Sequence, residues 1–110
     1  MPVMTTKPGE VYRVDLGIGG KIRLMVVVSR EDADAPRALS LCAPITTSYR
    51  GSAYEVEIGK LPFLRKTSYV NIQGLQAIQH HELSGPVGSL SPSHMAAIKT
   101  ALKYALELEG

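Results

Sequence analysis

Two apolar runs dominate the hydrophobic pattern of this chain, one over residues 22–29 and one over residues 38–47. A charged segment that contains a proline, residues 30–37, separates them. Each run is rich in β-branched or aliphatic residues and is too short for a buried helix, so we expect a strand in each. The polar connection between them favours antiparallel pairing of the two strands.

The register of this strand pair has a chemical consequence. If Val28 pairs near Leu41, the same register places Arg23 opposite Thr46 at one end of the sheet. A permanently cationic guanidinium beside a hydroxyl is suited to gripping a phosphate. An ordinary sheet margin can carry the same two residues, so the pair alone leaves both interpretations open.

The rest of the pattern predicts further strands and one helix. Ser91 and Pro92 indicate a capped helix start, followed by apolar residues at helical spacing that should close one side of the sheet. That apolar stripe comprises Met95, Ile98, Leu102 and Ala105 or Leu106. We expect strands over residues 9–16, with Val11 and Val14 near the core, over residues 53–58, and over residues 69–78, the last kinked or bulged at Gly74.

Bulk properties narrow the class of protein. A length of 110 residues fits a single domain, residues 1–110. No apolar run approaches the roughly 20 residues needed to cross a bilayer, and the first residues contain no signal-peptide pattern, so we expect a cytoplasmic protein without a membrane partner. The single cysteine, Cys42, is interpreted as a small buried hydrophobe. A net charge of +2 is too small to indicate nucleic-acid binding by itself.

Three polar segments carry candidate chemistry. The loop over residues 48–52 contains Tyr49 and Arg50, which can stack on a base and neutralise a phosphate, although most such loops are simply solvated. The glycine-rich stretch 17–20 lacks the Lys-Thr ending of a phosphate loop, so a flexible turn is expected. His80 and His81 have no third ligand at useful spacing, which favours an exposed loop pair over a metal site.

The order of several segments resembles the MazF/PemK family of toxin ribonucleases over nearly the whole chain. The matching segments are residues 9–12 (Gly-Glu-Val-Tyr), 23–29 (Arg-Leu-Met-Val-Val-Val-Ser), 44–47 (Pro-Ile-Thr-Thr), 70–72 (Val-Asn-Ile) and 88–92 (Gly-Ser-Leu-Ser-Pro). The resemblance implies a mainly β fold with a C-terminal α-helix, as a small SH3-like barrel that works as a homodimer. It also implies cleavage of single-stranded RNA, often messenger RNA, without a metal or other cofactor, and an antitoxin protein that blocks the RNA groove.

The resemblance also assigns residues. It makes Arg23 and Thr46 the catalytic pair. RNA supplies its own nucleophile, the 2′-hydroxyl, so the protein need only orient it and stabilise charge on the phosphorane. The RNA-binding residues expected beside this pair are Lys21, Thr47, Tyr49, Arg50, Asn71 and Gln73.

Several departures from the family pattern bear on the chemistry. The first loop, residues 15–22, is shorter than the family segment, which often carries an acidic residue or a histidine before the arginine. Leu24 stands where a proline usually follows the arginine, and Asn71 and Gln73 stand where PemK-type relatives place an arginine and an aspartate. Since Gln73 cannot act as a base, the sequence assigns no proton acceptor. A non-catalytic nucleic-acid-binding module therefore stays open, as does a protein-binding toxin similar to CcdB. That toxin, however, relies on a terminal Trp-Gly-Ile, and this chain has no tryptophan.

Overall fold

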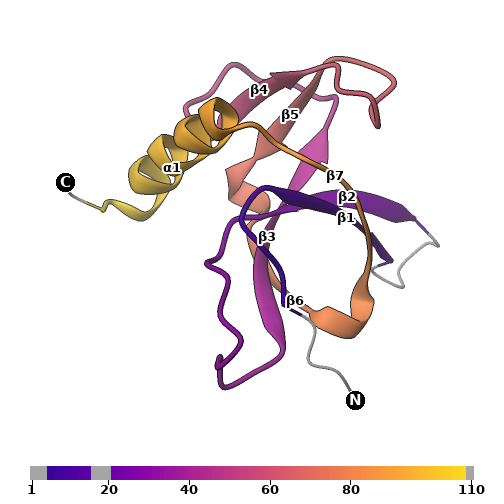
Figure 1. The fold of residues 1–110 in the computed structure, drawn as a ribbon. Helices are drawn as coiled ribbons and strands as arrows, with labels where there is room; N and C mark the ends of the chain where they lie inside the picture. Colours follow the sequence, from indigo (N-terminus) through magenta and orange to yellow (C-terminus); the bar gives the residue numbers. More distant parts are fainter. Residues whose placement is uncertain (1–4, 16–20, 109–110) are drawn as a thin grey trace.

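The chain folds into one antiparallel sheet followed by a helix, as the computed structural model shows for residues 5–15 and 21–108 (Figure 1). In these residues the sheet has seven strands. They are β1 (Glu10–Asp15), β2 (Ile22–Val27), β3 (Leu39–Thr46), β4 (Glu55–Gly59), β5 (Ser68–Asn71), β6 (Gln76–Gln79) and β7 (Leu83–Ser89), with 3-10 turns η1 (Ile72–Gly74) and η2 (His80–Glu82) and helix α1 (Pro92–Leu106). The predicted glycine-rich turn, residues 17–20, lies outside the described residues.

The predicted register between β2 and β3 is confirmed. Met25 lies opposite Pro44, and the backbone N–H of Val28 donates to the carbonyl of Leu41 at 2.9 Å. The recorded pairing of the two strands ends at Met25 and Pro44, two residues before Arg23 is reached. After Pro44, strand β3 pairs with β5 instead of β2.

Strand β3 pairs with two strands along its other edge. Its first half pairs with β6, and its last two residues pair with β5, where Thr46 lies opposite Tyr69. The prediction of one bulged strand over residues 69–78 is therefore wrong, because the turn η1 divides this segment into β5 and β6. Gly74 does mark the bend. A Cβ atom on Gly74 would lie 2.5 Å from Cγ of Pro44, so the turn can pack this closely on β3 only with glycine.

The expected barrel is not closed. The strand order is β4-β5-β3-β2-β1-β7, with β6 added to β3, and no pairing is recorded between β4 and β7 in the described part of the chain. Helix α1 lies beside β4 (Figure 1). It begins as predicted, with the Ser91 hydroxyl accepting from the His94 N–H at 3.2 Å and Pro92 at the first position.

The alternation of side chains divides the core into two clusters. One lies under the helix, and the other lies on the opposite face of the sheet. Val11 and Val14 are fully buried as predicted, one in each cluster. Cys42 is also fully buried, and burial raises the pKa of its thiol to about 11. Of the predicted helix stripe, Met95, Ile98, Leu102 and Ala105 contact the first cluster, whereas Leu106 is exposed.

The prediction of an exposed histidine pair is wrong for His80. The two histidines begin the turn η2, and His80 is half-buried, with its Nε2 atom 2.8 Å from the Ser40 hydroxyl. Ser40 is itself buried and bonds the Thr6 hydroxyl at 2.6 Å. His81 is exposed as expected and contacts the side chain of Gln79. In the described residues no helix has the length and apolar character needed to span a membrane.

Candidate functional site

Thr46 lies at the end of β3, on the rim between two surface hollows. Both hollows include it in their lining. Its Oγ1 atom accepts a hydrogen bond from the Ser48 N–H at 3.0 Å. Because that bond uses a lone pair of the oxygen, the hydroxyl proton of Thr46 remains able to point outward and donate.

The first of these, which we call the polar hollow, collects several residues predicted for RNA binding. It has a volume of about 440 Å³. Two segments that are distant in the sequence line it: one contributes Thr46 and Arg50, and the other contributes Asn71 and Gln73. They meet because β5 pairs with the end of β3 and the turn η1 follows β5 directly. The remaining lining residues are Ser48, Ser52, Tyr54 and Glu55.

Glu55 is a site residue that the sequence did not reveal, because its place in the strand expected over residues 53–58 gives no sign of which residues lie beside it. Its carboxylate accepts from the Arg50 N–H at 2.9 Å, from the Ser52 N–H at 2.9 Å and from the Ser52 hydroxyl at 2.7 Å. These bonds, the Ser52 hydroxyl first among them, lower the pKa of Glu55. The carboxylate is therefore a weak proton acceptor that fixes the loop carrying Arg50.

The turn η1 is organised by a similar local bond. Oδ1 of Asn71 accepts from the Gln73 N–H at 3.1 Å, which caps the turn and presents the exposed Gln73 side chain. Neither residue is ionisable. The polar hollow thus supplies hydrogen-bond donors and acceptors rather than a base.

Tyr49 has a defined position in the loop after β3. Its ring stacks on that of Tyr69, with centroids 4.5 Å apart and an interplanar angle of 12°. Tyr69 lies opposite Thr46 in the sheet, so the stacked pair lies next to Thr46. Tyr49 is still 56 % exposed, which leaves its ring accessible to a base.

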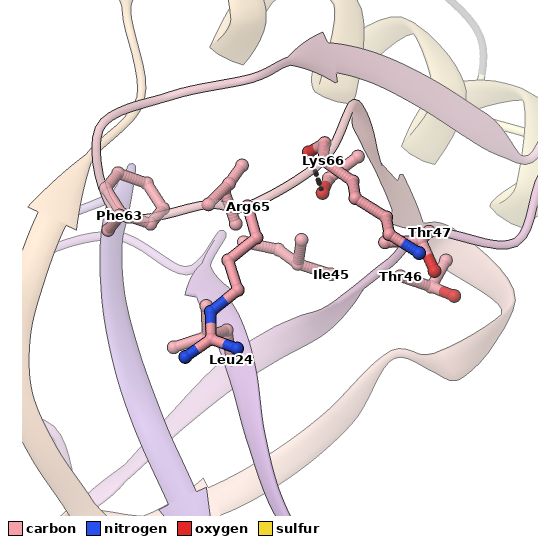
Figure 2. A pocket seen from close by; sticks show the side chains of 9 residues that line it. Leu24, Ile45, Thr46, Thr47, Phe63, Arg65 and Lys66 are labelled. Atoms are coloured by element: carbon pink, nitrogen blue, oxygen red, sulfur yellow. Dashed lines mark hydrogen bonds between the residues drawn. The ribbon is translucent and has the colours of Figure 1, made fainter.

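The second hollow, which we call the basic hollow, lies on the other side of Thr46 and has a volume of about 430 Å³. Thr47, one of the predicted RNA-binding residues, lines it. Arg65 and Lys66 also line it and come from the connection between β4 and β5 (Figure 2). The sequence by itself indicates no role for this pair, because two adjacent cations in a connection carry no information about which surface they share. The remaining lining residues are Leu24, Ile45, Phe63, Leu64 and Ser68.

Arg23 lines neither of these hollows. It is exposed near the start of β2, opposite Val14 of β1. Opposed residues share a face of a sheet, so Arg23 lies on the same face as Val14 and Met25, and strand alternation places Thr46 on the corresponding face of β3. Lys21 is exposed immediately before β2 and is not among the lining residues of either hollow. Its contact with RNA stays a prediction.

Within residues 5–15 and 21–108, no group of three or more His, Cys, Asp or Glu side chains is placed so that it could hold a metal ion.

Comparisons with known proteins show which proteins the whole chain is similar to. "Probable endoribonuclease MazF5" of Mycobacterium tuberculosis is 36% identical over 108 residues, covering 94% of this chain and 97% of that protein. A solved structure described as an endoribonuclease in complex with its cognate antitoxin, from a mycobacterial species, matches with a TM-score of 0.81 and 31% identity, covering 96% of this chain and 98% of the other. The toxin MazF-mt6 of M. tuberculosis matches with a TM-score of 0.76 and 27% identity, covering 92% and 99%.

A family model agrees with these matches. The model of PemK-like, MazF-like toxins of type II toxin-antitoxin systems matches residues 7–106. This range runs from before β1 to the end of α1 and includes both hollows. The chain therefore belongs to the family of PemK-like, MazF-like toxins of type II toxin-antitoxin systems.

Proposed function

We propose that this toxin is an endoribonuclease that cleaves single-stranded RNA, including messenger RNA, at the rim formed by Thr46. The observation that carries the proposal is the position of Thr46 between a polar and a basic hollow, in a chain whose relatives are named endoribonucleases. A strand of RNA laid across this rim would meet hydrogen-bonding groups on one side and cations on the other. The reaction would take place in the cytoplasm, where messenger RNA is translated.

The reaction uses the nucleophile of the substrate. The 2′-oxygen attacks the adjacent phosphorus, and the bond from phosphorus to the 5′-oxygen breaks. A 2′,3′-cyclic phosphate and a 5′-hydroxyl result, with the proton of the 2′-hydroxyl passing to solvent and the 5′-oxygen taking one up. No bond to the protein forms, so the protein contributes orientation and charge stabilisation.

Thr46 and Arg23 divide this task. The hydroxyl of Thr46 donates to a nonbridging phosphate oxygen, while its own oxygen is held by Ser48. The guanidinium of Arg23 neutralises the charge that accumulates on the phosphorane. Arg50 contacts the RNA backbone, and Tyr49 stacks on a base beside the cleaved bond.

The direct test is incubation of the purified protein with a long single-stranded RNA in the presence of EDTA. We expect fragments that end in cyclic phosphate. Arg23→Ala and Thr46→Ala should each lower the cleavage rate by about 10²- to 10³-fold, the usual effect of removing one transition-state contact. Thr46→Ser keeps the hydroxyl and should retain most activity, and Lys99→Ala, on the exposed face of α1, serves as the charge control. Cleavage that survives Thr46→Ala undiminished would remove Thr46 from the reaction.

A non-catalytic RNA-binding module is the second candidate. It is favoured by the composition of the polar hollow: among its lining residues in the described part of the chain, Glu55 carries the one carboxylate, and hydrogen bonds lower the pKa of that group. The same experiment separates the two functions. RNA binding without cyclic-phosphate products would support the module.

The proposed partners follow from the family. We propose that this chain forms a homodimer and is inhibited by a cognate antitoxin protein, as the described complex of the mycobacterial endoribonuclease suggests. Light scattering of the isolated toxin tests the dimer. The antitoxin is tested by co-purification of the toxin with the small acidic protein that a neighbouring gene encodes. The complex of the two proteins should no longer cleave RNA.

A further inference from the structure

The basic hollow has the composition of a nucleotide-binding site. We propose that it binds the nucleotide next to the scissile phosphate, through its base and its phosphate; this assignment rests on the proposed RNA cleavage. Its volume of about 430 Å³ falls within the range of roughly 300–1,000 Å³ that is typical of small-molecule sites. The lining residues separate into an apolar floor and a cationic rim.

The floor is formed by side chains from different parts of the sheet. Leu24 comes from β2, Ile45 from β3, and Phe63 from the connection after β4. Phe63 is held in position by close packing, since a Cβ atom on Gly88 of β7 would collide with its ring. A fixed aromatic ring beside two aliphatic side chains offers a base a flat apolar surface, as in other sites for single-stranded nucleic acid.

The rim carries two positive charges. Arg65 and Lys66 are both exposed, and within residues 5–15 and 21–108 no acidic side chain lines this hollow. Figure 2 shows the guanidinium of Arg65 above Leu24 and the ammonium group of Lys66 extending toward Thr47. The backbone at Lys66 is fixed because its carbonyl accepts from the Ser68 hydroxyl at 2.9 Å. Two cations held over an apolar floor match a nucleotide, whose base is flat and whose phosphate is anionic.

Thr46 links this site to the reaction. Because it lines both hollows, a strand whose scissile phosphate lies at Thr46 extends into the polar hollow on one side and into the basic hollow on the other. The nucleotide in the basic hollow would thus be an immediate neighbour of the cleaved bond. Its base contacts make Phe63 a residue that influences the cleavage sequence, and Arg65 and Lys66 position the backbone.

Binding to an RNA that cannot be cleaved tests the cationic rim independently of catalysis. The probe is a short single-stranded RNA of mixed sequence in which 2′-fluoro replaces each 2′-hydroxyl, titrated at several salt concentrations. For a double variant Arg65→Ala/Lys66→Ala we expect about tenfold weaker binding at low salt. The magnitude of the slope of log K against log salt should fall by about 0.7, the contribution of one phosphate contact on a single strand.

The matched control removes the same charge elsewhere. Arg37→Ala/Lys99→Ala deletes two exposed cations that do not line the basic hollow, so the salt slope should stay at the wild-type value. Equal slopes for wild type and the Arg65→Ala/Lys66→Ala variant would overturn the proposal. If the wild type binds this RNA but does not cleave the unmodified form, the proposed function fails while the nucleotide site stands.

Cleavage of RNAs that differ only at the nucleotides flanking the cut tests the floor. Phe63→Leu keeps an apolar side chain but removes the flat ring. The ratio of cleavage rates among the four bases should change by about tenfold at one immediate neighbour of the cut and stay constant at more distant positions. An unchanged base preference at both immediate neighbours would show that the ring does not contact the substrate.

Discussion

The contact between Gly74 and Pro44 offers a quantitative test of how the site is built. Substituting Gly74 with alanine would place the new methyl 2.5 Å from Cγ and 2.8 Å from Cδ of Pro44, well inside van der Waals contact. The proline ring is bonded to its own backbone nitrogen and cannot swing away as a flexible side chain would. The backbone of β3 or of the turn η1 must therefore move.

The expected magnitude follows from two opposing terms. Overpacking of this kind destabilises a protein by about 1–3 kcal/mol. Replacing glycine by alanine also stabilises the fold by about 0.4–1 kcal/mol, because it reduces the freedom of the unfolded chain. We expect Gly74→Ala to lower the free energy of unfolding by about 0.5–2 kcal/mol, or to lower the melting temperature by roughly 4 °C per kcal/mol for a chain of this length.

A double-mutant cycle isolates the clash. Pro44→Ala removes Cγ and Cδ, so Gly74→Ala should be nearly neutral or slightly stabilising in that background. The coupling energy between the two sites should equal the clash term, about 1–3 kcal/mol, measured by urea denaturation at one fixed protein concentration. If Gly74→Ala has the same effect in both backgrounds, the contact does not determine the position of the turn.

The same substitution should affect RNA binding. The turn η1 contains Gln73 and follows Asn71, and both line the polar hollow. A backbone shift there moves both amides away from the bound strand, so Gly74→Ala should weaken RNA binding even at temperatures where the variant is fully folded. Restored binding in the Pro44→Ala/Gly74→Ala variant would link the two effects, and its absence would separate them.

Three further predictions concern hydrogen bonds and pH. Ser40→Ala deletes a buried hydroxyl that forms a hydrogen bond with His80. We expect urea denaturation to show a free energy of unfolding that is lower by about 1–3 kcal/mol, and an unchanged value would contradict the structural role of the hydroxyl. Burial raises the pKa of Cys42 from 9.0 to about 11, so the folded state retains this proton longer than the unfolded chain does. Stability should fall as the pH rises from 9 to 11, and Cys42→Val should reduce that fall in thermal unfolding. Hydrogen bonds lower the pKa of Glu55 in the folded state, so the carboxylate contributes to stability above pH 4.5. This contribution is lost as the pH falls through the lowered pKa of the folded state. The Ser52 amide resonance should follow this titration, and Glu55→Gln should abolish it.

The local pattern of apolar and polar residues was sufficient to predict most of the strands and the helix. The β-branched run from Ile22 and the run ending at Thr46 predicted two strands in the observed register, because side-chain alternation and the charged connection are encoded within a short window. The cap at Ser91 and Pro92 located the start of the helix for the same reason. Family resemblance, carried by short ordered segments, then predicted the fold class and the enzyme activity.

The tertiary structure decided what surrounds Thr46. That β3 leaves β2 after Pro44 and pairs with β5 depends on contacts between residues far apart in the sequence, which no local pattern encodes. Glu55 reaches the polar hollow through a second long-range pairing, that of β4 with β5, in which it lies opposite Asn71.

Arg65 and Lys66 show the same difference between what local sequence determines and what tertiary structure determines. The position of Arg65 and Lys66 over Leu24 and Thr47 depends on how the connection from β4 to β5 folds back across the end of the sheet, which no local pattern encodes (Figure 2). Likewise, the hydroxyl of Ser40 in β3 holds His80 half-buried, through a contact with the turn η2, which lies next to β3 only because β6 pairs with β3 in the folded sheet. Short-range pattern thus determined the elements, and long-range packing determined which side chains share a surface.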